Sequence, residues 1–261
     1  MTETRRPDAA FVRQGRLREL LAHGTFRRTS ELSDELGVSV VTIRADLEEL
    51  EAQGAARRVR GGAVGTDGRA ESVFETTRNE AAAGKSRIAD HCVSLIQPGD
   101  IVMLDAGTTC AVIGRALGAS NLTDVTVVTN NLIAMHAMSM APGLELIVTG
   151  GTFRRQQHSL IDPFGTLVID RFRADIAFIG ATGVEREVGV TNVNAPEAEM
   201  KRAMIAASAR HIVVADSRKL GHASKVVVCA PEEVSLLVTD ADPASAEAIA
   251  LQKASWSIDY C

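Results

Sequence analysis

Small and polar residues follow five apolar runs in the chain beyond residue 100. They are Asp105, Gly107, Thr108 and Thr109 after the first run, Asn130 after the second, Gly150 and Gly151 after the third, Gly180 and Gly183 after the fourth, and Asp216 and Lys219 after the fifth. A glycine followed by two hydroxyl side chains at the start of a helix offers open backbone N–H groups, which suit a phosphate. Carboxylates and amides such as Asp105 and Asn130 suit sugar hydroxyls. Together these loops could bind a phosphorylated sugar, although each alone could be a turn or a helix cap.

Lysine is scarce in a chain that otherwise uses arginine. Its five lysines are Lys85, Lys201, Lys219, Lys225 and Lys253. A lysine ammonium is a compact point charge that suits a phosphate or a carboxylate. We therefore add Lys201, which follows Glu197 and Glu199 on a predicted helix, to the candidate ligand-binding residues with Lys219. For Lys85 we favour an exposed, ion-paired surface position.

The candidate residues are expected at one edge of a β-sheet. Short β-branched runs alternate with helical stretches, and we expect strands at 101–104, 125–129, 144–148, 176–179, 212–215, 225–229 and 235–238. The intervening segments 85–96 and 197–210 carry apolar residues at helical spacing. Continuous apolar strands indicate a sheet covered on both faces, as in an α/β domain with a largely parallel sheet. Ligands bind at the carboxyl ends of such strands, where the five loops begin.

A second set of candidate binding residues lies before residue 64. We expect a helix at 29–36, a turn at Gly37, and a second helix that opens with Ser39 as its N-cap. Apolar residues at helical spacing, which must pack inward, are Ile43, Leu47 and Leu50. A helix-turn-helix followed by a basic ribbon is how a small domain enters DNA.

The outward-facing residues of this region are the candidate DNA contacts. They are Ser39, Val41, Thr42, Arg44, Ala45 and Glu48 on the second helix, and Arg57, Arg58 and Arg60 in the ribbon. Arginines in a ribbon suit phosphate contacts. The competing interpretation is an ordinary amphipathic hairpin with a solvated basic face. A further helix at about 11–22, with Leu17, Leu20 and Leu21 facing inward, would close a three-helix core.

Composition and charge fit two globular domains. The 261 residues are 46% hydrophobic and 23% charged, with a net charge of -5. Residues 1–65 hold eleven arginines and ten acidic residues, whereas the rest holds 17 basic and 23 acidic residues. The positive character therefore lies with the helix-turn-helix. We place a winged helix-turn-helix domain at 8–63, a linker at 64–76 and an α/β ligand-binding domain at 77–253.

The cysteines and the hydropathy pattern suggest the cellular setting. Four cysteines, at positions 92, 110, 229 and 261, form no C-x-x-C pair. We therefore expect no metal site and no disulfide framework. We also expect no cofactor. No stretch approaches 18 consecutive apolar residues, and the first residues lack the apolar core of a signal peptide. These features favour a soluble protein of the reducing cytoplasm, without a membrane partner.

The N-terminal residues resemble the DeoR family of bacterial transcriptional regulators. That family has a VSxxTIRRDL recognition helix followed by a G-x-x-x-R-x-HGGA wing, and this chain has VSVVTIRADL and GAARRVRGGA. Ala45 replaces the family's second arginine, and Arg60 replaces the histidine before the paired glycines. The first change lies on the outward face of the recognition helix, so the operator sequences of relatives do not carry over. Arg60 offers a phosphate contact in return.

The resemblance continues along nearly the whole chain. The family's sensor domain shows K-x-x-IA, LDxGTT, TVVTN, a GG pair, D-x-AF-x-G-x-x-G, AE-x-x-K and D-x-x-K-x-G, and this chain has KSRIA, LDAGTT, TVVTN, VTGG, DIAFIGATG, EAEMK and DSRKLG. The resemblance implies the fold shared with ribose-5-phosphate isomerase and related sugar-phosphate binders. It also implies that the domain senses a phosphorylated metabolite.

Two classes of function remain open. In the first, the chain is a transcription factor, usually a repressor in this family, whose affinity for a double-stranded DNA operator is controlled by a phosphorylated sugar. Such proteins read paired half-sites, so we expect a dimer or a tetramer. In the second, it is a sugar-phosphate isomerase with an accessory DNA-binding domain, which needs a positioned carboxylate base. The loop 180–183 lacks the acid that related isomerases carry there, although Glu197 and Glu199 remain candidate bases. We therefore expect a regulator without catalytic residues.

Overall fold

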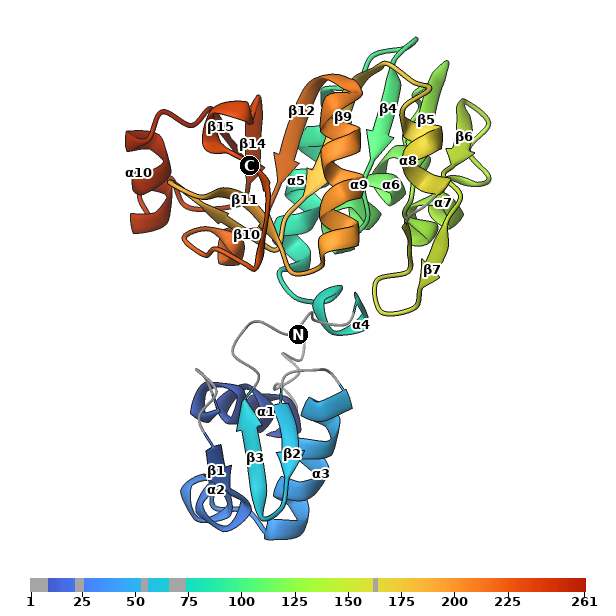
Figure 1. Ribbon diagram of the computed structural model, residues 1–261. Coiled ribbons are helices and arrows are strands. Elements are labelled where there is room, and N and C mark those ends of the chain that lie inside the picture. Colours follow the sequence, from blue (N-terminus) through green and yellow to red (C-terminus); the bar gives the residue numbers. More distant parts are fainter. Residues whose placement is uncertain (1–8, 22–25, 53–55, 66–73, 162–163) are drawn as a thin grey trace, which may run out of the picture. The chain divides into compact units, whose positions relative to one another are not determined.

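The computed structural model describes residues 9–21, 26–52, 56–65, 74–161 and 164–261 (Figure 1). The chain divides into two compact units, Met1–Thr76 and Thr77–Cys261. Most of the linker expected at 64–76 lies outside the described residues. Each unit has a hydrophobic core of its own.

In the described residues before position 66, the first unit forms three helices and a small antiparallel sheet. Its elements are α1 (Ala9–Leu20), β1 (Phe26–Arg28), α2 (Thr29–Leu36), α3 (Val40–Ala52), β2 (Ala56–Val59) and β3 (Gly62–Gly65). Strand β3 lies between β1 and β2 and is antiparallel to both. The expected helices and the basic ribbon are confirmed, and the unit is a winged helix-turn-helix. Strand β1 was not expected, because three residues are too few to show a strand pattern.

Local sequence signals define the turn between α2 and α3. Gly37 closes α2 with a φ of +64°, and its N–H donates to the Ser33 carbonyl. Ser39 caps α3, because its Oγ accepts the Thr42 N–H at 3.1 Å. The buried core of this unit consists of Leu17, Leu21, Leu32, Ile43, Leu47, Leu50, Ala56 and Ala63.

The wing is the β2–β3 hairpin, whose tip is formed by Arg60 and Gly61. Gly61 has a φ of +87°, which favours glycine. A Cβ atom on Gly62 would lie 2.1 Å from the carbonyl oxygen of Arg27. Only glycine therefore lets β3 approach β1 this closely.

A seven-stranded parallel sheet dominates the second unit. Its strands are β4 (Ile101–Leu104), β5 (Val125–Thr129), β6 (Leu144–Val148), β9 (Ala174–Gly180), β12 (Ser208–Val214), β14 (Leu236–Thr239) and β15 (Ile258–Tyr260). Their order is β15-β14-β12-β9-β4-β5-β6, and every neighbouring pair is parallel. The expected α/β class with a parallel sheet is confirmed. The strand order reverses between β4 and β9, which makes this pair the topological switch point.

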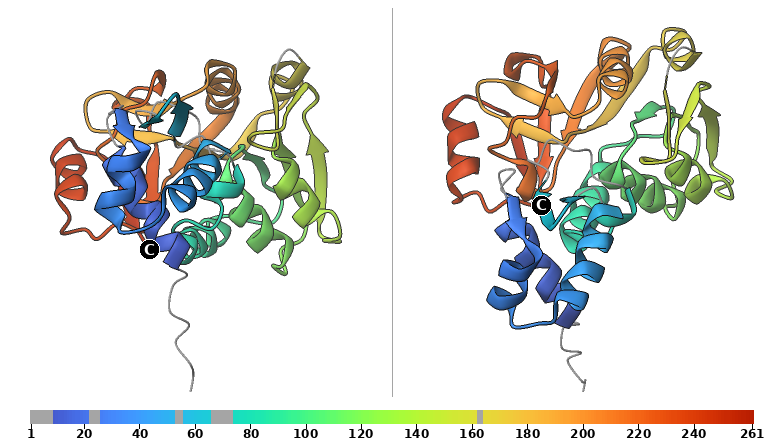
Figure 2. Two further views of the ribbon diagram at one scale, coloured as in Figure 1. Left: turned by 90° about the horizontal axis from the view of Figure 1, so that it is seen from below. Right: turned by 60° about the horizontal axis from the view of Figure 1, so that its bottom comes forward.

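Helices cover both faces of the sheet (Figure 2). The helices that begin in this unit are α5 (Ala82–Ser94), α6 (Thr108–Gly118), α7 (Leu132–Met138), α8 (Phe164–Ile169), α9 (Ala195–Ala206) and α10 (Ala246–Lys253), and the short α4 (Phe74–Thr77) spans the sequence boundary between the units. On β9, Phe178 faces the cluster formed with α5, α6 and α7, whereas Ile179 faces the cluster formed with α8 and α9. Successive strand residues point to opposite faces, which explains why the strands are continuously apolar.

Two smaller antiparallel sheets complete the second unit. The first has the order β10 (Gly183–Glu185), β11 (Gly189–Asn192), β13 (Val226–Cys229), and the second pairs β7 (Thr152–Arg154) with β8 (Ser159–Ile161). The expectation that 225–229 joins the main sheet is wrong, because β13 pairs with β11. The apolar run predicted the strand, but strand pairing depends on tertiary contacts that a single run does not encode.

Candidate functional site

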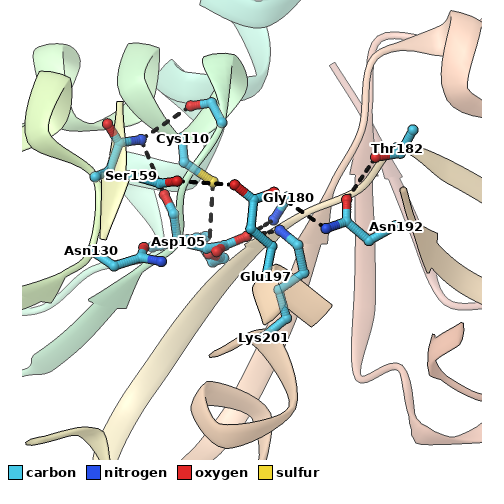
Figure 3. Close-up of polar contacts among 12 residues, drawn as sticks. Asp105, Cys110, Asn130, Ser159, Gly180, Thr182, Asn192, Glu197 and Lys201 are labelled. Atoms are coloured by element: carbon cyan, nitrogen blue, oxygen red, sulfur yellow. Dashed lines mark hydrogen bonds and ion pairs between the residues drawn. The ribbon is translucent and has the colours of Figure 1, made fainter. Parts of the chain in front are cut away.

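The carboxyl ends of β4 and β9 meet at the switch point, where Asp105 and Gly180 lie side by side (Figure 3). Asp105 follows β4 directly, and its Oδ2 accepts the N–H of Gly180, the last residue of β9, at 2.9 Å. The Lys201 ammonium, on α9, forms an ion pair with the same carboxylate. Ligands of open α/β sheets bind at such a switch point.

The Asp105–Lys201 pair is cut off from solvent. Asp105 is 1% exposed and Lys201 3% exposed. Burial raises the pKa of Asp105 above its ordinary value, although the Lys201 ammonium opposes this effect. Burial alone disfavours the charged form of Lys201, but the carboxylates of Asp105 and Glu197 outweigh it and raise the pKa of Lys201. The buried pair joins the end of β4 to α9 directly beneath the switch point.

The N-terminus of α6 opens beside this pair. Gly107 precedes the helix with a φ of +106° and, as a glycine, has no side chain of its own to cap it. The Asn131 side-chain amide donates to the carbonyls of Asp105 (3.2 Å) and Gly107 (3.1 Å), which fixes the loop. Thr109 is buried and Thr108 is half-buried at the first turn. The first N–H groups of α6 are therefore available to an anion.

Two buried polar atoms at the neighbouring strand ends have no partner in the part of the chain that the structure describes. They are Asn130 Oδ1, after β5, and Thr149 Oγ1, after β6. The Asn130 Nδ2 atom donates to the Leu160 carbonyl at 3.2 Å. Unsatisfied buried polar atoms are uncommon in native proteins, so these two mark a place where a polar ligand could complete the hydrogen bonding.

Glu197, on α9, is the centre of a buried hydrogen-bond network. Its carboxylate forms an ion pair with Arg154 and accepts the Ser159 hydroxyl (2.9 Å) and the Asn192 amide (3.3 Å). Thr182 donates in turn to Asn192 at 2.7 Å. This network joins the β7–β8 hairpin to α9 and β11. A carboxylate with three donors is poorly placed to accept a proton from a substrate.

The remaining glycines among the candidates have mostly packing roles. Gly151 has a φ of +130°, and a Cβ there would lie 2.1 Å from the Ile161 carbonyl oxygen. A Cβ on Gly183 would lie 2.3 Å from the His222 carbonyl oxygen. Gly150 is exposed, with no such contact below 3.5 Å.

Asp216 and Lys219 lie at the carboxyl end of β12. Asp216 is buried, and its two oxygens accept Nε and Nη2 of Arg218 at 2.9 and 3.2 Å. Arg218 also reaches Glu80, at 2.7 Å. Lys219 is half-buried at the end of a short 3-10 turn, Ser217–Lys219. Lys219, unlike Asp216, has no ion-pair partner among the residues that the structure describes.

The first unit presents the second set of candidates. Val41, Arg44 and Ala45 are exposed on α3. Arg57 and Arg60 are exposed on the wing and make no ion pair with any described residue. Arg58 differs from them, because its Nη1 pairs with Glu48 at 3.1 Å and its backbone N–H donates to Glu51 at 2.7 Å. Arg58 thus joins the wing to α3 before any DNA is present.

Sequence comparison places both units in one family. A model of the DeoR-like helix-turn-helix domain matches residues 13–68, and a model of the DeoR C terminal sensor domain matches residues 80–241. The chain belongs to the DeoR family.

Two relatives match this DeoR chain along most of their length. The HTH-type transcriptional regulator GlpR of Haloferax volcanii is 35% identical over 229 residues, which are 87% of this chain and 89% of GlpR. The HTH-type transcriptional repressor GlcR of Bacillus subtilis is 33% identical over 227 residues, which are 82% of either chain. The chain is therefore a transcriptional regulator, and the isomerase alternative is not supported.

Solved structures with a similar fold are more distant from the DeoR chain. Ribose 5-phosphate isomerase A of Methanocaldococcus jannaschii matches 52% of this chain and 52% of its own, with 21% identity and a TM-score of 0.39. A likeness at this level supports no conclusion about ligand or reaction.

Among the described residues, no helix is long and apolar enough to span a membrane.

Lys85 of the DeoR sensor unit does not lie where the sequence suggested. It is 1% exposed, and its Nζ donates to the Thr77 carbonyl at 2.6 Å. The expectation of an exposed ion-paired surface position is therefore wrong. Burial is the main cause that lowers the pKa of Lys85 to about 8, and the positive charges of Arg218 and Lys219 add to it, whereas Asp216 opposes it.

We expect the stability of the sensor unit to increase between pH 8 and 10.5 through Lys85. In this range the unfolded chain holds a proton that the folded protein has lost, so the free energy of unfolding rises with pH, by at most about 3 kcal/mol. Lys85→Met should remove this rise. Urea unfolding at several pH values, followed by the fluorescence of Trp256, measures it, with exposed Lys225→Met as the control. Parallel curves for wild type and Lys85→Met would show that Lys85 does not titrate in this range.

Proposed function

We propose that this DeoR-family regulator represses genes of sugar metabolism and that a phosphorylated sugar, bound in the second unit, lowers its operator affinity. The observation that carries the proposal is the open N-terminus of α6 beside the switch point between β4 and β9. The repressor assignment is supported by the relative GlcR, which is itself a transcriptional repressor.

The phosphate is assigned to the first turn of α6. Gly107, Thr108 and Thr109 present backbone N–H groups and hydroxyls there, at the positive end of an eleven-residue helix. Lys219, at the same edge of the sheet, adds a positive charge. The sugar hydroxyls are assigned to the side of Asn130 and Thr149, whose buried oxygens have no partner among the described residues.

The DNA contacts are assigned to α3 and to the wing tip. Arg44 on α3, and Arg57 and Arg60 on the wing, are exposed and unpaired with any described residue. Winged helix-turn-helix proteins read paired half-sites, so the operator-bound form is a dimer or a tetramer. Effector binding then changes the arrangement of paired DNA-binding units. A coupling free energy of about 1 to 3 kcal/mol, which corresponds to roughly 5- to 150-fold in affinity, is typical of such control.

Thr108→Val and Lys219→Ala should blunt the effector response without weakening operator binding. The first removes a hydroxyl from the proposed phosphate site, and the second removes a charge. The measurement is the operator Kd of the full chain at increasing concentrations of glucose 6-phosphate, fructose 6-phosphate, ribose 5-phosphate or glycerol 3-phosphate. Thr123→Val, exposed before the amino end of β5, and Lys253→Ala, exposed at the end of α10, are matched controls. An undiminished response in both test variants would place the phosphate elsewhere.

A further inference from the structure

Helix α3 exposes an aliphatic side chain on its outward face. Val41 is 74% exposed, which is the largest value for a large hydrophobic residue in the described part of the first unit. It lies in the first turn of α3, the end of a recognition helix that contacts base edges. Valine is also a weak helix former, so helix propensity does not explain its presence there.

The polar side chains around Val41 already have partners within the unit. Ser39 and Thr42 bond to each other, with Oγ to Oγ1 at 2.9 Å and the Thr42 N–H to Ser39 Oγ at 3.1 Å. Asp46 is buried and accepts two hydrogen bonds from Arg13, at 2.5 and 3.1 Å. These side chains are therefore engaged in capping α3 and in holding it against α1.

The second half of α3 is acidic where it is exposed. Glu48 and Glu51 are both held by Arg58 of the wing, and Glu49 is exposed beside them. These carboxylates repel DNA phosphates, so the surface of α3 that can face bases is confined to its first two turns. Three exposed side chains lie there: the apolar Val41 and Ala45, and Arg44, whose guanidinium has no hydrogen-bond partner among the described residues.

Val41 and Ala45 are one helical turn apart on the same face. Because alanine has no long side chain, position 45 does not hold α3 away from the floor of a groove. An aliphatic side chain cannot bond to phosphates or to the donors and acceptors of base edges. In the major groove its one chemical complement is the 5-methyl group of thymine.

We propose that Val41 contacts the 5-methyl group of a thymine in each operator half-site, beside the base or phosphate that Arg44 contacts. This inference rests on the proposed placement of α3 in the major groove. It makes Val41 a determinant of operator specificity that acts through apolar contact rather than through hydrogen bonds.

The test replaces thymine by uracil, which removes the methyl group and keeps every hydrogen-bonding group. The full chain first selects its operator from random-sequence DNA, and each thymine of one half-site is then changed to uracil in turn. We expect one substitution to raise the Kd of the wild type about fourfold, the effect of burying one methyl group. Val41→Ala should bind the thymine operator more weakly and lose the difference between thymine and uracil at that position. Val188→Ala, an exposed valine of the second unit (39%), should keep the difference.

The results of these experiments distinguish failure of the Val41–thymine contact from failure of the proposed placement of α3. If no uracil substitution affects the wild type, or if Val41→Ala shows the same loss as the wild type, the methyl contact is refuted. If Arg44→Ala still weakens binding in that case, α3 remains in the groove and only the role of Val41 fails. If neither Arg44→Ala nor Val41→Ala affects binding, the placement of α3 fails as well.

Discussion

Replacing Arg44 by alanine is expected to cost about 1 to 3 kcal/mol of operator binding free energy per half-site and to leave effector binding unchanged. Arg44 is exposed on α3 and has no partner among the described residues, so its guanidinium is free for a base or a phosphate. Effector binding takes place in the other unit. Operator Kd values of the full chain at several salt concentrations, together with thermal shifts caused by sugar phosphates, measure both effects.

Arg58→Ala is a contrasting variant, because Arg58 is the wing arginine that already has a partner. Its guanidinium is paired with Glu48 at 3.1 Å in the free protein, so any contact with DNA must replace an existing ion pair. A phosphate contact changes the slope of log K against log salt by about 0.9. We expect Arg57→Ala and Arg60→Ala to reduce this slope by about that amount, and Arg58→Ala to change it less.

If the Arg44→Ala variant binds the operator as tightly as the wild type, the assignment of α3 as the recognition helix is refuted.

Lys201→Met is expected to lower the free energy of unfolding of the second unit more than any other substitution proposed here. Removal of the ammonium leaves the buried Asp105 carboxylate with the Gly180 N–H but without a counter-ion. Breaking a buried pair in this way typically costs about 3 to 5 kcal/mol. The loss should become smaller as the pH falls, because burial already raises the pKa of Asp105 and the variant carboxyl takes up a proton on folding. Denaturant unfolding followed by Trp256, the single tryptophan, reports on this unit.

The double variant Asp105→Asn/Lys201→Met separates charge from packing. Removal of both charges eliminates the uncompensated carboxylate, so part of the lost stability should return. The exposed Lys225→Met should stay within about 0.5 kcal/mol of the wild type. A Lys201→Met protein as stable as the wild type at neutral pH would show that the ion pair does not stabilise the switch point.

Strand positions could be predicted closely where a β-branched run is bounded by turn residues. The runs 101–104, 125–129 and 144–148 coincide with β4, β5 and β6. Strand partners were harder to predict, as 225–229 shows, because pairing depends on contacts between distant segments. The last strand, β15, was missed because its sequence Ile258–Tyr260 includes a charged residue and is only three residues long.

The candidate site was predictable in its location but not in its internal pairing. Loops after parallel strands must lie at one edge, so Asp105 and Gly180 could be expected near each other. The ion pair between Asp105 and Lys201 joins residues 96 positions apart, and no local pattern encodes it. Lys85 was misjudged because lysine is rarely buried, and nothing in the local sequence shows that its Nζ donates to the Thr77 carbonyl in a buried position.

A phosphorylated sugar in the second unit is expected to control operator binding by the first. The most direct measurement is the operator Kd of the full chain with a panel of sugar phosphates and with the same sugars unphosphorylated. We predict that one phosphorylated compound raises the Kd by roughly 5- to 150-fold while its free sugar has no effect. An operator Kd that no sugar phosphate changes, or that free sugars change equally, would show that the second unit does not control DNA binding through a phosphorylated sugar.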